Sequence, residues 1–226
     1  MSFFGSAFFG RITPVVKNII IINALVFLAT FVAGYEFVCG YSDLKLNFYL
    51  GMYLPGSSNF QPYQIITHFF AHGGFIHLLF NMYALFLFGS ALENVWGAKR
   101  FFIFYVVTAL GAAFCHAVVQ YVRLQGFEGM EYNYILECHH VVGASGAVFG
   151  LLLGFGMLFP NTVIVLLFPP IPIKAKYFVL FYGLGELYFG IANNPGDNVA
   201  HFAHLGGMLF GYLLIKLWKK DRTNFY

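Results

Sequence analysis

The possible folds are limited above all by a series of six apolar segments that together make up about half of the chain. They cover approximately residues 15–34, 77–94, 101–122, 144–159, 177–192 and 199–218. A helix that crosses a bilayer needs about 20 mainly apolar residues. Only 9% of the residues are charged, whereas a soluble domain carries about 25%. We therefore predict an all-α, polytopic membrane protein with six transmembrane helices.

The remaining residues supply the loops of one domain. The sequence contains no internal repeat and no low-complexity tract, so we expect residues 1–226 to form a single domain with its core at about 15–218. The loop between the first two segments, residues 35–76, is long and aromatic. That composition is typical of short helices that lie in the membrane interface. We therefore expect the first outer loop to be helical.

Lysine and arginine indicate the orientation, because cytoplasmic loops carry an excess of both. With the N-terminus placed inside, ten of the twelve fall on the inner side and two on the outer side. This distribution predicts that both termini face the cytoplasm. The inner residues are Arg11, Lys17, Lys99, Arg100, Lys174, Lys176, Lys216, Lys219, Lys220 and Arg222, and the outer ones are Lys45 and Arg123.

Charge and cysteine content narrow the function further. The net charge is only +3 and no basic cluster stands out, which argues against a nucleic-acid partner. Cys39, Cys115 and Cys138 show no metal-binding spacing, and we expect neither a metal nor a cofactor. Cys39 and Cys138 fall in two outer loops and can pair there, but two free thiols are the favoured interpretation.

Polar groups within membrane spans are costly and are therefore functional candidates. The first is in the pattern GASG at 143–146, at the outer start of the fourth segment. Gly143 and Gly146 leave the Ser145 hydroxyl uncrowded and let another backbone come close. The alternative is that Ser145 is only a small packing residue, and for this pattern alone that alternative is favoured.

The second candidate is in the pattern AHLGG at 203–207, in the outer half of the sixth segment. A histidine at the depth of His204 needs a polar partner, and near neutral pH it can accept a proton. Gly207 and Gly211 have the spacing that lets membrane helices touch. The alternative is a structural histidine bonded to backbone, which fits the neighbouring His201 better.

The third candidate is the pair His77 and Asn81, which lie on one face of the second segment because residues four apart are neighbours on a helix. Both side chains can donate to a single oxygen, as an oxyanion hole requires. Two interhelical hydrogen bonds are the alternative. All three patterns lie at the outer ends of their segments, so they share one depth. A serine, a base and additional donors at one level are the components of acyl transfer.

At these residues the chain resembles the rhomboid family of intramembrane serine proteases, over about 15–218. The patterns occur in the family's order, and two further runs, at 72–77 and 93–100, resemble the family as well. The GxSG serine is Ser145, the AHxxG histidine is His204, and the HxxxN pair is His77 and Asn81.

The resemblance implies a catalytic dyad within a six-helix rhomboid-like bundle. His204 would take the proton of Ser145, whose oxygen would attack a peptide carbonyl. The Ser145 backbone N–H and the side chains of His77 and Asn81 would hold the oxyanion. Phe149 falls one turn after Ser145, where the family often has an aromatic residue that packs against the catalytic histidine.

A triad would need a carboxylate to orient the histidine. No Asp or Glu lies in the outer half of the second, fourth or sixth segment. Glu186, in the fifth segment, is the only acid deep in a predicted span, while Glu137 and Asp197 fall in outer loops. The absence of an obvious third member agrees with the dyad that the resemblance implies, in which His204 acts without an acidic partner.

The resemblance also implies the substrates, which would be single-span transmembrane proteins that enter from the lipid bilayer between the second and fifth spans. We expect a bacterial inner membrane location, with the active site open to the outer side. One alternative is a non-catalytic relative that binds membrane helices, although such relatives usually lose the serine or the histidine. Another is a histidine-lined metal transporter, but the predicted spans have almost no carboxylates.

Overall fold

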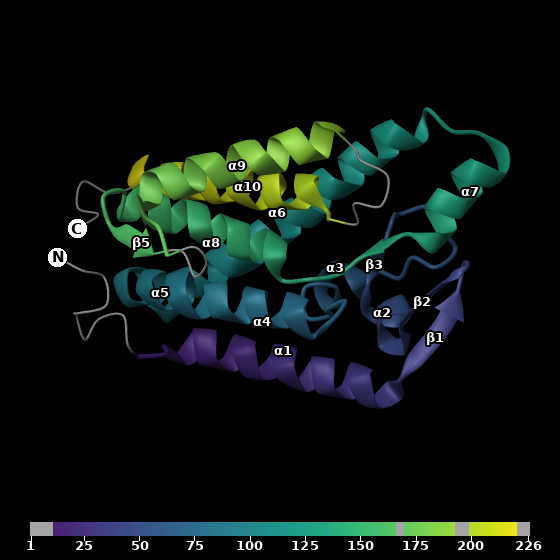
Figure 1. Cartoon of the computed structure of the whole chain (residues 1–226), viewed down its shortest axis with the longest axis horizontal. Coiled ribbons are helices and arrows are strands. Elements are labelled where there is room, and N and C mark those ends of the chain that lie inside the picture. The colour runs from purple at the N-terminus through teal and green to yellow at the C-terminus, as the bar shows by residue number, and fades with distance from the viewer. Residues whose placement is uncertain (1–10, 166–169, 193–198, 221–226) are drawn as a thin grey trace.

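The structure is a computed structural model that describes residues 11–165, 170–192 and 199–220. Arg222, Asp197 and the remaining parts of the predicted 1–226 domain lie outside the described residues. The described chain is predominantly helical, and its long helices surround a common apolar core (Figure 1).

Each predicted apolar segment corresponds to a helix whose ends agree within three residues. The first is α1 (Pro14–Ala33). The second is a continuous helix made of α4 (Phe75–Ala84), the π-helical turn η2 (Leu85–Gly89) and α5 (Ser90–Trp96). The others are α6 (Ala98–Leu124), α8 (Ser145–Leu158), α9 (Ala175–Ala192) and α10 (His201–Lys220).

Three of these helices are long and apolar enough to cross a membrane, within the residues described: Pro14–Ala33, Phe75–Trp96 and Ala98–Leu124. Helix α8 is apolar but has only 14 residues, and a crossing needs about 20. The chain is therefore built to lie in a membrane, while the count of six crossings stays a prediction.

The all-α prediction was incomplete, because the loops contain six short strands among the described residues. Strands β1 (Tyr35–Val38) and β2 (Tyr41–Leu44) form an antiparallel hairpin. Strand β3 (Met52–Tyr53) pairs with β4 (His140–Val141), and β5 (Val163–Val165) pairs with β6 (Pro172–Lys174). Loop backbone that is not helical gains partners in this way for its N–H and C=O groups.

The helical prediction for the first outer loop is right only in part. This loop contains α2 (Lys45–Leu50) and α3 (Gln64–Thr67), but also β1, β2 and β3. It is fixed to the loop after α6, which contains α7 (Gly129–Cys138). A disulfide joins Cys39 to Cys138, so the expectation of two free thiols was wrong. Both cysteines lie in loops that meet at one end of the bundle, which lets them pair.

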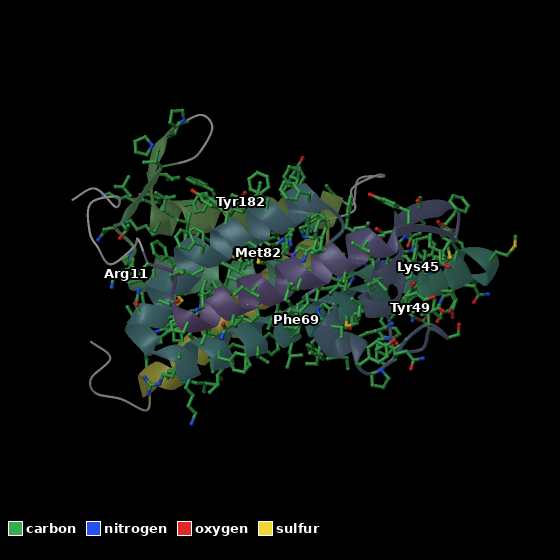
Figure 2. All side chains as sticks on the ribbon, turned by 90° about the horizontal axis from the view of Figure 1, so that it is seen from below. Arg11, Lys45, Tyr49, Phe69, Met82 and Tyr182 are labelled. Carbon is green, nitrogen blue, oxygen red and sulfur yellow. A yellow bond between two sulfur atoms is a disulfide. The ribbon has the colours of Figure 1, made fainter. Side chains whose placement is uncertain are left out.

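The two ends of the bundle differ in what they contain. Helix α1 begins and helix α10 ends at the same end, whereas β1, β2 and α7 lie at the opposite end (Figure 1). Arg11 lies at the first end, and Lys45 and Tyr49 lie at the other (Figure 2). This arrangement is consistent with an even number of crossings between the two termini.

A buried carboxylate fixes the start of α1. Glu93 accepts hydrogen bonds from the backbone N–H groups of Val15 and Val16, both at 3.0 Å, and from the Thr13 hydroxyl. The first N–H groups of a helix lack partners within the helix, and a negative charge there is favourable. Glu93 thereby holds α1 against α5.

Helix α10 packs tightly against α6 and α8 because small residues line the contact. A Cβ atom at Gly207 would overlap the backbone carbonyl of Gly146, so the two helix backbones touch. A Cβ at Gly211 would lie 3.3 Å from the Gly150 carbonyl oxygen. On the α6 side, Ala112 lies directly opposite Gly146. These contacts hold the N-terminal halves of α8 and α10 together.

Candidate active site

Ser145 is the first residue of α8, and the loop before it sets its position. Gly143 has φ +126°, a conformation that side chains rarely adopt, and its N–H donates to the His68 carbonyl at 2.9 Å. The backbone N–H groups at the start of α8 have no partner within the helix, and they form the positive end of its dipole. Ser145 therefore combines a hydroxyl with donors suited to an anion.

His204 lies in the first turn of α10, opposite Ser145. Its Nε2 atom is 2.8 Å from the Ser145 Oγ atom, the distance of a good hydrogen bond. His204 is buried, with 8% of the residue exposed, so bulk water competes little for this contact. A hydroxyl bonded to an imidazole nitrogen is the arrangement that activates a serine nucleophile.

Phe149 covers one face of the His204 ring. The two rings are stacked, with centroids 4.1 Å apart and planes only 7° from parallel. Phe149 lies one turn after Ser145 on α8, so the same helix positions both Ser145 and the ring that stacks on His204. Tyr182, from α9, also contacts Phe149, with ring centroids 5.7 Å apart.

His77 lies beside Ser145, on α4. A Cβ atom at Gly143 would be 2.9 Å from His77 Nε2 and 3.6 Å from Ser145 Oγ, so Gly143 leaves room for the imidazole next to the serine. Asn81 is buried one turn further along α4 and donates its amide to the His77 carbonyl at 2.8 Å. The structure thus brings His77 near the hydroxyl, whereas Asn81 uses one donor within its own helix.

A carboxylate contacts His204, contrary to the expectation that it has no acidic partner. Glu186, on α9, places its Oε2 atom 2.8 Å from His204 Nδ1. The same oxygen lies 2.7 Å from Nδ1 of His201. The expectation failed because it considered only the second, fourth and sixth predicted segments, while the carboxylate comes from the fifth. The available signal was that Glu186 is the only acid deep in a predicted span.

Glu186, His201 and His204 are also the one group among the described residues whose ligand atoms lie close enough to hold a metal ion. Zinc bonds of about 2.0–2.1 Å in tetrahedral geometry place neighbouring ligand atoms about 3.3 Å apart. The two nitrogens lie 2.7 and 2.8 Å from the carboxylate oxygen, which are hydrogen-bond distances. The geometry favours direct hydrogen bonds over a shared metal.

Two further histidines, His68 and His72, lie in the segment between α3 and α4. Burial lowers the pKa of His68 to about 4 and that of His72 to about 3, so both are neutral at pH 7. The His68 Nδ1 atom bonds the Gln64 carbonyl at 2.8 Å. His68 also lines a small cavity with Gly143 and Ser145. The neutral His68 ring therefore adds no positive charge to the cavity that Ser145 also lines.

The family comparison covers this whole site. The model of the Rhomboid domain matches residues 59–220. The chain belongs to the rhomboid family. The matched region includes α4, α8, α9 and α10, and with them Ser145, His204, His77 and Asn81.

Relatives of this rhomboid chain include proteins named as proteases. It is 30% identical over 218 residues to a Bacillus subtilis (strain 168) protein named as the rhomboid protease YdcA. The aligned region covers 95% of this chain and 94% of that protein. It is 34% identical to "Rhomboid protein 1, mitochondrial" of Saccharomyces cerevisiae, over 71% of this chain and 44% of that one. It is 26% identical to "Rhomboid protease AarA" of Providencia stuartii, over 63% and 51% respectively. The chain is thus an integral membrane protein of a protease family.

Proposed function

We propose that this chain is an intramembrane serine endopeptidase that hydrolyses peptide bonds in or near the transmembrane segments of other proteins. The observation that carries the proposal is the 2.8 Å contact between His204 Nε2 and Ser145 Oγ. It occurs at the shared level predicted for the two residues, in a chain that belongs to the rhomboid family.

The first step is acylation of the serine. His204 Nε2 accepts the hydroxyl proton while Ser145 Oγ forms a bond to the carbonyl carbon of the substrate. The tetrahedral intermediate then collapses, the C–N bond breaks, and His204 returns the proton to the leaving amine. General acid–base catalysis by a positioned histidine contributes about 10²- to 10⁴-fold to a rate. In the second half-reaction water attacks the acyl ester by the same route.

Negative charge develops on the carbonyl oxygen in both steps and needs donors. The Ser145 backbone N–H is one, since it lies at the start of α8 where no helical carbonyl reaches it. The His77 ring beside Gly143 is well placed to supply a second, and the remaining amide hydrogen of Asn81 a third. Each donor of this kind is worth about 10²–10³ in kcat.

The proposed substrates are single-span membrane proteins that reach the site sideways from the lipid bilayer, between the second and fifth spans. The proposed location is a bacterial inner membrane, with both termini in the cytoplasm and the site open to the outer side. The Cys39–Cys138 disulfide supports this orientation, because disulfides persist on oxidising sides of membranes. It ties together the two loops assigned to the outer side.

The second candidate function is a non-catalytic relative that binds membrane helices. This reading has less support, because such a protein has no need for a serine and a histidine in hydrogen-bond contact. A cleavage assay distinguishes the protease from the helix-binding protein. The purified protein in liposomes should cleave a single-span substrate, whereas Ser145→Ala and His204→Ala should each abolish turnover and Asn81→Ala should weaken it. Equal cleavage by Ser145→Ala would exclude the serine mechanism, and a lack of cleavage by the wild type would favour the binding protein.

A further inference from the structure

The carboxylate of Glu186 lies on the far side of the His204 ring from Ser145. Its Oε2 atom is 2.8 Å from Nδ1, while Nε2 is 2.8 Å from the serine oxygen. We propose that Glu186 is a positioning residue that completes a Ser145–His204–Glu186 triad. This inference rests on the proposed protease function and extends it beyond the dyad that the sequence predicts.

The contact matters because an imidazole has two tautomers. For His204 to accept the serine proton, Nε2 must be unprotonated and Nδ1 must carry the hydrogen. A carboxylate at Nδ1 accepts that hydrogen and so fixes this tautomer. When Nε2 takes up the proton, the same carboxylate stabilises the imidazolium, as the orienting acid does in soluble serine proteases.

The contact with His201 indicates whether the Glu186 carboxyl group is ionised. His201 Nδ1 lies 2.7 Å from the same Oε2 atom that contacts His204. One carboxyl proton can be donated to only one of these nitrogens. An ionised carboxylate, by contrast, accepts from both Nδ1–H groups at once. The shared oxygen therefore favours the ionised form, and with it the reactive tautomer of His204.

The Glu186 carboxylate is largely buried, so its charge would be costly in free energy without its two histidine partners. The side chains of Glu186 and His204 are 12% and 10% exposed, within a bundle whose core is mainly apolar. A buried charge is tolerated when it is paired and hydrogen-bonded. The two histidines meet that need for Glu186. A carboxylate retained at such a place is a functional candidate by default.

The fold holds α9 so that Glu186 keeps its position. Arg123, at the end of α6, donates to the Gly190 carbonyl at 2.6 Å. Its guanidinium also lies 5.2 Å from the centre of the Phe202 ring on α10. One arginine thus fixes the outer ends of α9 and α10 together, one turn beyond the glutamate. Since His201 also holds the carboxylate, Glu186 has little freedom to leave His204.

The test compares Glu186→Gln and Glu186→Asp with the wild type in steady-state cleavage. An amide can donate to Nδ1 as well as accept from it, so Glu186→Gln should no longer fix the reactive tautomer and should raise the population of the unreactive one. We expect kcat to fall on the order of 10- to 100-fold, less than the ~10⁴-fold seen when a soluble protease loses its orienting carboxylate in this way. KM should change less than about threefold. Glu186→Asp, which keeps the charge, should recover part of kcat, and Glu137→Gln, in an outer loop, should match the wild type.

The tautomer of His204, that is, which of its ring nitrogens carries the hydrogen, can be measured without a cleavage assay. In protein with ¹⁵N-labelled histidine, the His204 signals are assigned by their loss in His204→Asn. The wild type should show a protonated Nδ1 and a bare Nε2, and Glu186→Gln should move the proton toward Nε2. An unchanged tautomer together with a kcat within about twofold of wild type would overturn the proposal. If the wild type does not cleave any substrate, the protease function fails, and the tautomer measurement still decides whether Glu186 orients His204.

Discussion

His204 and Ser145 are separated by 59 residues in the chain, yet their Nε2 and Oγ atoms lie 2.8 Å apart. The contact depends on the close approach of α8 and α10, in which Gly207 touches the Gly146 carbonyl. The contact that supports the proposed chemistry therefore depends on how closely α8 and α10 pack, so a substitution that changes this packing should also change activity.

Gly207→Ala should cost both stability and activity. Its Cβ atom would overlap the Gly146 carbonyl, so α10 must move away from α8 and the contact of His204 with Ser145 lengthens. Overpacking typically costs about 1–3 kcal/mol, and we expect cleavage to fall at least tenfold. Thermal unfolding in detergent and a cleavage assay measure the two effects. Gly185→Ala is the stability control, since its Cβ would meet nothing within 4 Å.

Phe149→Leu should slow cleavage modestly. Leucine retains apolar bulk but loses the stacked contact with His204, whose ring planes are 7° apart. Aromatic pairs contribute about 0.5–1.5 kcal/mol beyond area burial, which corresponds to a roughly 2- to 12-fold fall in kcat. Phe102→Leu, at a half-exposed position on α6, should leave kcat unchanged. Wild-type kcat in Phe149→Leu would show that the stacking does not restrain the base.

Cys39→Ser should destabilise the protein under oxidising conditions. The disulfide to Cys138 closes a loop with a sequence separation of 99 residues, and loss of a native disulfide typically costs about 2–5 kcal/mol. The melting temperature of the variant should match that of the reduced wild type. Cys115→Ser removes the free thiol and should leave the response to reductant intact. A wild-type melting temperature that reductant does not change would contradict the expectation.

Acid should destabilise the fold through His68. Its pKa is lowered to about 4 by burial, against 6.5 in the unfolded chain, so the unfolded state binds more protons between these values. The contribution of His68 to the free energy of unfolding is therefore fully present above about pH 6.5. It is lost as the pH falls toward 4, by up to about 3 kcal/mol. Unfolding of the wild type and His68→Gln across this range measures the difference. An identical pH dependence in both proteins would contradict the role of His68.

The sequence was sufficient to predict the helices because their apolar segments are long and free of charge. The ends of α8 were predicted within one residue, since Ser145 follows a glycine-containing turn and Pro160 stops the helix. The strands in the loops were not predicted. Pairs as short as β3 with β4 have too few residues to show a periodicity, and they form only because the loops they belong to are brought together.

Long-range partners were harder to predict than elements. Ser145, His204 and His77 could be placed at one depth from the topology, but nothing in the chain states which helices are neighbours. Glu186 is an example of a residue whose partner the sequence alone does not identify. Helices α9 and α10 follow each other closely, so Glu186 and His204 lie at similar depths at 1.5 Å per residue, yet only the structure places the two side chains in contact. The Cys39–Cys138 pair likewise depends on loop positions that the sequence leaves open.

In the proposed mechanism, His204 makes Ser145 a nucleophile. Labelling with a serine-directed fluorophosphonate, followed by peptide mapping, tests it most directly because no substrate is needed. We expect the wild type to be labelled at Ser145 and His204→Ala to remain unlabelled, although both proteins retain the same thermal unfolding profile. Equal labelling of the two proteins, or no labelling of a folded wild type, would contradict it.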